Sequence, residues 1–253
     1  MSGLPSAFHL QCGQIFGRPF RATKNLEEFN DYYKVRHPAD GPYKAEERAL
    51  AQALRKGETA PPVEFNVEVQ GEHHLWAHRP SVFMFNHQSI LDGYVLLHLL
   101  RRGFTGIAKQ EAAKMPLLGQ ILRGLDFAFI DRSNSRNAIE TMKPAVDRLR
   151  LGMSVVIAPE GTRSLTPRLG RFKKGAFHMA MQADAAVVPV VIRNSYQVMT
   201  RGSLLFRPGT VQVCVLPPVD VATWKVEDLD RHVAEVQALF QRTLDDWPTA
   251  GRG

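Results

Sequence analysis

The stretch FNHQSILDGY, residues 85–94, holds a histidine five residues ahead of an aspartate. If a helix begins between them, the Asp92 carboxylate can accept a hydrogen bond from His87 Nδ1 and leave Nε2 free as a general base. The same carboxylate would stabilise the imidazolium that forms. A structural alternative stays open, because Ser89-x-x-Asp92 also fits a capping box at a helix start, with His87 as an ordinary loop residue.

Two further polar stretches follow apolar runs in the same way. The run VVIAP leads into EGTR, residues 160–163, and FAFI leads into DRSNSR, residues 131–136. A glycine turn with hydroxyl, amide and guanidinium donors suits a phosphate group. Each stretch also has a plain reading, as a strand-end turn closed by an ion pair or as a solvated basic turn. Lys109 after a strand, and Lys173 and Lys174 at a helix start, are weaker candidates, because such lysines usually lie on the surface.

The sequence offers no nucleophile of its own beside the histidine. No Gly-x-Ser-x-Gly elbow occurs in the chain, which favours direct attack by a substrate hydroxyl over an acyl-enzyme. His73, His74 and His78 lack a cysteine or carboxylate at ligand spacing, so we expect no metal site. Cys12 and Cys214 are far apart and predict neither a zinc site nor a disulfide framework.

The elements around these residues predict an α/β protein. Short apolar runs that read as strands alternate with helical stretches near residues 89–101, 111–123, 135–150, 173–183 and 226–247. This order predicts a three-layer sandwich with a largely parallel or mixed central sheet flanked by helices. Residues 1–60 read as an N-terminal helical segment and residues 61–253 as the α/β domain. In such folds the loops after the strands converge, which would bring the polar stretches together.

Composition limits the partners. The chain of 253 residues carries a net charge of +7, which suits an anionic membrane surface, phosphorylated small molecules or nucleic acid. Aromatic residues do not interleave with the basic ones in any stacking platform and no nucleic-acid motif occurs, so we expect no nucleic-acid partner. We find no secretion signal and no apolar window long enough to span a membrane, and we expect a protein peripheral to the cytoplasmic face of the cell membrane.

Taken in order, four stretches resemble the motif blocks of the glycerolipid acyltransferases, in particular the bacterial PlsC-like 1-acylglycerol-3-phosphate acyltransferases. They are NHQSILD, FIDR, PEGTRS and the proline in VVPVVI, within roughly residues 63–217. The resemblance implies transfer of an acyl chain from acyl-CoA or acyl-carrier-protein to the sn-2 hydroxyl of a lysophospholipid, 1-acylglycerol 3-phosphate, with no cofactor. It implies His87 as the base and Asp92 as its orienting partner. It further implies an acyl pocket shaped by Pro189 and a substrate-binding set of Lys109, Arg132, Glu160, Gly161, Thr162 and Arg163.

An acceptor that lives in a membrane requires a docking surface. The first 60 residues combine apolar and basic side chains, as does the loop at residues 196–209, where Leu204, Leu205 and Phe206 lie between Arg201 and Arg207. Core packing with solvated arginines is the alternative for both. Two alternatives for function also remain: an acceptor such as glycerol 3-phosphate or another lysophospholipid, and a non-catalytic lipid or acyl-carrier binding protein.

Overall fold

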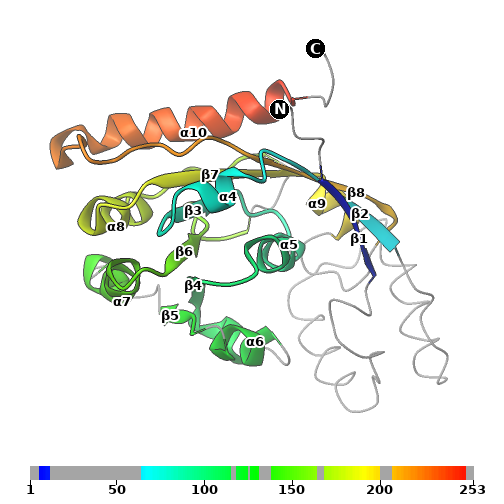
Figure 1. Ribbon diagram of the computed structural model, residues 1–253, viewed down its shortest axis with the longest axis horizontal. Helices are drawn as coiled ribbons and strands as arrows, with labels where there is room; N and C mark the ends of the chain where they lie inside the picture. The colour runs from blue at the N-terminus through cyan, green and yellow to red at the C-terminus, as the bar shows by residue number, and fades with distance from the viewer. Residues whose placement is uncertain are drawn as a thin grey trace, which may run out of the picture.

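The computed structural model describes residues 64–114, 118–124, 126–130, 138–163, 168–199 and 207–248, and the backbone of residues 6–11. Within these residues the strands form one eight-stranded sheet in the order β1-β2-β8-β7-β3-β6-β4-β5, shown in Figure 1. The strands are β1 (Ser6–Gln11), β2 (Glu64–Gln70), β3 (Val82–Phe85), β4 (Phe104–Lys109), β5 (Ala128–Ile130), β6 (Ser154–Ile157), β7 (Val187–Arg193) and β8 (Gly209–Val215).

The sheet is mixed, and its central part is parallel. β7, β3, β6, β4 and β5 pair in parallel, whereas β8 pairs with β7 and β1 pairs with β2 in antiparallel fashion. The carboxyl ends of the five parallel strands therefore share one edge of the sheet. Loops that follow these strands gather at that edge, as in other open α/β sheets.

Helices cover both faces, which gives three layers (Figure 1). The longer ones are α5 (Leu91–Leu100), α7 (Ala138–Arg150), α8 (Gly175–Ala183) and α10 (Leu229–Asp245). The shorter ones are α4 (His74–Ala77), α6 (Leu118–Gly124), α9 (Ser195–Val198) and the 3₁₀ turns η1 (Gln110–Lys114) and η3 (Val226–Asp228). No described helix is both long and apolar enough to cross a bilayer.

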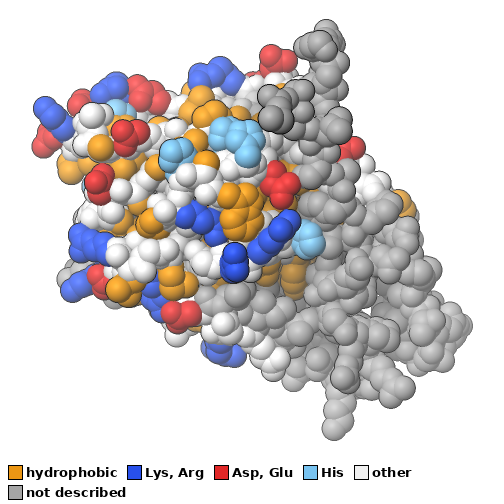
Figure 2. Space-filling model, in the orientation of Figure 1, with side chains coloured by type: hydrophobic (Ala, Val, Ile, Leu, Met, Phe, Trp, Pro, Cys, Tyr) orange, Lys and Arg blue, Asp and Glu red, His pale blue; other side chains and the backbone are white. Residues whose placement is uncertain are grey.

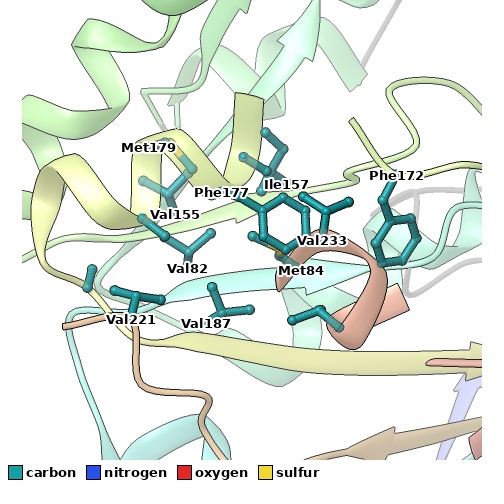
Figure 3. Close-up of a cluster of buried hydrophobic side chains, with 14 of the residues drawn as sticks. Val82, Met84, Val155, Ile157, Phe172, Phe177, Met179, Val187, Val221 and Val233 are labelled. Carbon is teal, nitrogen blue, oxygen red and sulfur yellow. The ribbon is translucent and has the colours of Figure 1, made fainter. Parts of the chain in front are cut away.

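Two apolar cores lie on the two faces of the sheet. Because strand side chains alternate, Val82 and Met84 of β3 enter the core beneath α7, α8 and α10, while Phe83 and Phe85 enter the core beneath α5. Figure 3 shows Phe177 of α8 within the first core, together with Met84. Phe240 of α10 is fully buried there and meets Phe172 edge to face, with ring centroids 5.1 Å apart.

The predicted fold class is confirmed, and the strand–helix order from β3 to α8 follows the prediction. The helical stretch expected at residues 111–123 consists instead of η1 and α6. Residues 6–11, which lie within the predicted N-terminal helical segment of residues 1–60, form β1 along β2 of the main sheet. The rest of that segment lies outside the described residues.

Candidate active site

His87 and Asp92 meet at the carboxyl edge of β3. Asp92 is the second residue of α5 and is fully buried, while the His87 side chain retains 24% of its exposure. His87 Nδ1 lies 3.0 Å from Asp92 Oδ2. Since an ionised carboxylate only accepts hydrogen bonds, Nδ1 carries the hydrogen and Nε2 keeps a free lone pair. The arrangement can therefore take a proton from a bound hydroxyl group.

The two sequence readings of this stretch turn out to be compatible. Asp92 Oδ2 also accepts hydrogen bonds from the backbone amides of Gln88 and Ser89, both at 2.7 Å, and Ser89 Oγ accepts one from the Leu91 amide at 3.2 Å. These bonds satisfy amides at the start of α5, as a cap does. One carboxylate thus caps the helix and orients the imidazole. Its other oxygen, Oδ1, is buried and has no hydrogen-bond partner among the described residues.

The histidine loop is also anchored to distant segments of the chain. The Asn86 side chain donates to the Ile192 carbonyl and accepts from the Ile192 amide, both at 2.7 Å. It therefore extends the β3–β7 ladder by one step beyond Phe85, where the strand pairing ends. Ser89 Oγ donates to the Met199 carbonyl at 2.6 Å. Asn86 is part of the NHQSILD motif, but the motif alone predicts no role for it. An amide directly after a buried strand was the available signal.

Glu160 reaches the same loop from the end of β6. Its Oε1 accepts the backbone amide of His87 and its Oε2 accepts the backbone amide of Gly170, both at 2.7 Å. Glu160 is only 5% exposed, and burial raises the pKa of its carboxyl group, while the hydrogen bonds from His87 and Gly170 act in the opposite direction. Gly170 was not anticipated from the sequence, because its importance depends on a contact ten residues away.

The other predicted site residues differ in how far the structure places them. In the turn after β6, Gly161 has φ of +75°, which suits glycine, and its amide donates to the Ala158 carbonyl at 3.0 Å. Thr162 is exposed and Arg163 is half-buried in the same turn. Lys109 ends β4 at the shared edge, but its side chain lies outside the described part, as does all of Arg132.

Pro189 lies inside β7, where it is buried opposite Met84 of β3. Its carbonyl accepts the Leu216 amide at 2.9 Å, just beyond the last residue of β8. In a strand the N–H and C=O of one residue point to the same side, so the missing N–H of Pro189 faces the end of the β7–β8 ladder. This position explains how a central strand tolerates a proline.

The weaker candidate residues lie away from His87 or already form an ion pair. Lys174 Nζ pairs with Asp230 at 2.8 Å, as expected for a lysine on the surface.

Within the described residues, no group of three or more His, Cys, Asp or Glu side chains is arranged to hold a metal ion, and this includes the histidines around α4. A surface cavity of about 710 Å³ lies along α10 and another of about 320 Å³ between α7 and α8; neither is lined by His87.

The fold and the site together define an α/β protein with a carboxylate-oriented histidine at the carboxyl edge of parallel strands. The family model for acyltransferases matches residues 66–193, which is half of the chain, and the chain belongs to this family. The predicted relationship to the PlsC-like acyltransferases is confirmed.

Individual relatives give the same picture. A 1-acyl-sn-glycerol-3-phosphate acyltransferase of Limnanthes alba is 34% identical over 179 residues, 70% of this chain and 63% of that protein. The protein of the same name from Saccharomyces cerevisiae is 32% identical over 184 residues, 72% of this chain and 60% of that protein. The chain thus spans less than two thirds of the length of these relatives. The crystal structure of PlsC from Thermotoga maritima, a 1-acyl-sn-glycerophosphate acyltransferase, is similar with a TM-score of 0.62 at 25% identity, covering 88% of this chain and 81% of that chain.

Proposed function

We propose that this protein transfers a fatty acyl chain from acyl-CoA or acyl-carrier-protein to the sn-2 hydroxyl of 1-acylglycerol 3-phosphate, giving phosphatidic acid. The observation that carries the proposal is the hydrogen bond between His87 Nδ1 and Asp92 Oδ2, which prepares Nε2 as a base at the edge of the sheet. The names of the relatives support the choice of acceptor.

In the proposed reaction the acceptor hydroxyl attacks the thioester carbonyl directly. His87 Nε2 takes the hydroxyl proton as the new C–O bond forms, and Asp92 stabilises the resulting imidazolium. The tetrahedral intermediate then collapses, the C–S bond breaks, and the imidazolium returns the proton to the departing sulfur. The products are phosphatidic acid and a free thiol, and no acyl-enzyme forms.

The substrate contacts follow from the same proposal. Arg163 and Arg132 would hold the phosphate of the acceptor, because a guanidinium group matches a phosphate with two parallel hydrogen bonds. Thr162 offers hydrogen-bond donors beside Arg163 in the turn that Gly161 permits, and Lys109 lies at the same sheet edge, where it would help to bind the acyl donor. Pro189 would shape the acyl pocket. The reaction needs no cofactor, because proton transfer and charge stabilisation come from these side chains.

The proposal is tested by a thiol-release assay with acyl-CoA and 1-acylglycerol 3-phosphate, with the lipid product identified by mass spectrometry. We expect release that depends on the acceptor and a product of the mass of phosphatidic acid. Glycerol 3-phosphate and other lysophospholipids serve as competing acceptors, and acyl-carrier-protein as the second donor. Preference for another acceptor would replace the proposed substrate, whereas binding of lysolipid without any thiol release would favour the non-catalytic lipid binder.

We also propose that the protein docks on an anionic membrane from its cytoplasmic face, since the acceptor is a lipid and the chain is basic. Most of the first 60 residues and Arg201 to Phe206 of the second predicted docking surface lie outside the described residues. Phe8 and Leu10 belong to β1. Truncation of the N-terminus would also remove a strand, so replacement of Phe16 and Phe20 by serine is the cleaner variant. Unchanged partition into anionic vesicles would refute a role for these two side chains.

A further inference from the structure

We infer that Glu160 is a positioning residue for His87 and does not hold the phosphate of the acceptor. The inference rests on the proposed function and assigns a different role from the substrate-binding one that the motif resemblance implies. It begins from the carboxylate itself, which is 5% exposed and whose two oxygens each accept a backbone amide at 2.7 Å. Bonds of this length to an ionised carboxylate are among the stronger hydrogen bonds in proteins.

The two amides belong to different loops. His87 follows β3, whereas Gly170 belongs to the segment that precedes α8, so Glu160 ties three parts of the active edge together. Its own turn is held in place as well, because the Gly161 amide donates to Ala158 and the Lys173 amide donates to the Pro159 carbonyl at 2.9 Å. The carboxylate is therefore held in place, and its hydrogen bond fixes the position of the His87 backbone.

Glu160 packs so closely against Gly170 that residue 170 has no room for a side chain. An added Cβ at residue 170 would overlap Glu160 Oε2 and come within 3.2 Å of Glu160 Cδ. The Gly170 backbone has no positive φ, so the absence of a side chain there is explained by the approach of Glu160 rather than by backbone conformation. The contact also gives a second way to disturb Glu160, from a residue that carries no side chain of its own.

Charge argues against a direct contact with the acceptor phosphate. A carboxylate and a phosphate repel each other, whereas a phosphate site needs cations or N–H donors. The neighbouring Arg163 meets that need, while the oxygens of Glu160 face backbone amides. Asp92 thus orients the imidazole ring of His87, and Glu160 fixes its backbone. Since a misplacement of about 1 Å costs on the order of 10²-fold in rate, holding both matters for the position of Nε2.

The kinetic test compares two variants of the same turn. Glu160→Gln keeps the size but directs an NH₂ group at one of the two amides, so at least one bond is lost. We expect kcat to fall about 10- to 100-fold with KM for 1-acylglycerol 3-phosphate within about twofold of the wild type. Arg163→Ala should instead raise that KM. A raised KM with an unchanged kcat in Glu160→Gln would overturn the inference, because it would make Glu160 a ligand of the acceptor.

A stability test gives a second result that does not depend on turnover. Gly170→Ala should lower the urea midpoint in the wild-type background and leave it unchanged in the Glu160→Ala background, where no carboxylate remains to overlap. Gly124→Ala is the matched control, since a Cβ there meets nothing within 4 Å. Equal effects of Gly170→Ala in both backgrounds would contradict the proposed contact. If Glu160→Ala does not fold, the kinetics of Glu160→Gln decide. If the wild type shows no turnover, the proposed function fails while the urea test still decides on the contact.

Discussion

Replacement of Asp92 by asparagine isolates the charge that faces His87. The side chain keeps its shape, and its oxygen can still accept the amides of Gln88 and Ser89, so the start of α5 should persist. What is lost is a negative charge 3.0 Å from His87 Nδ1. At an effective dielectric constant of about 20, two unit charges at this distance attract by roughly 5 kcal/mol. This value is an upper bound on the stabilisation of the imidazolium that the asparagine variant loses.

The bound converts to a fall in kcat of about 10³- to 10⁴-fold, because each 1.36 kcal/mol changes the rate about tenfold. The assay is thiol release at saturating concentrations of both substrates, with urea unfolding of the same preparations. Asp92→Ala is the companion variant. It also removes one hydrogen bond from each of two buried amides, so its free energy of unfolding should fall by about 2–6 kcal/mol. A kcat of Asp92→Asn within tenfold of the wild type would refute the role of Asp92 in activating His87.

Four further predictions concern stability and titration. Burial raises the pKa of Glu160 above its ordinary value of 4.5, so the folded protein binds this proton more tightly than the unfolded chain. Its contribution to the free energy of unfolding should therefore decline as pH rises above about 4.5, and urea titrations of Glu160→Gln should lack that decline; identical slopes would count against it. Burial raises the pKa of the Cys214 thiol to about 11, so in a Cys12→Ser background a thiol reagent at pH 8 should label it only after unfolding. Asn86→Ala leaves both backbone groups of Ile192 unpaired and should cost about 2–6 kcal/mol in urea unfolding, together with a lower kcat; an unchanged midpoint would contradict the importance of these two hydrogen bonds. Phe240→Ala should cost about 3–5 kcal/mol by the same measurement, and a loss below about 1 kcal/mol would contradict its packing in the core.

Local pattern was enough to predict the parallel part of the sheet and the pairing of His87 with Asp92. A spacing of five residues across a helix start leaves few geometries, and the alternation of apolar strands with helices has few solutions in three dimensions. The same spacing could not separate a cap from a catalytic pair. The structure explains this, because one carboxylate oxygen serves both purposes. The net charge says less about the site than these local patterns do, because basic and acidic side chains are interspersed over the face shown in Figure 2.

Contacts between distant segments could not be predicted in the same way. The partner of Asn86 lies 106 residues away and that of the Glu160 Oε1 lies 73 residues away, and no periodicity encodes either pair. The order of the eight strands, and the joining of residues 6–11 to β2, likewise depend on which hydrophobic surfaces meet in the folded chain. For Glu160, the motif predicts that the residue belongs to the site, whereas only its contacts in the structure indicate its role.

The most direct test of the central claim is turnover of His87→Ala with acyl-CoA and 1-acylglycerol 3-phosphate, both saturating, beside a wild-type preparation of matched stability. Loss of a general base predicts a fall in kcat of about 10²- to 10⁴-fold. The free energy of unfolding should change little, because the backbone amide of residue 87 can still donate to Glu160. Equal turnover of the two proteins would contradict the assignment of His87 as the residue that takes the acceptor's proton.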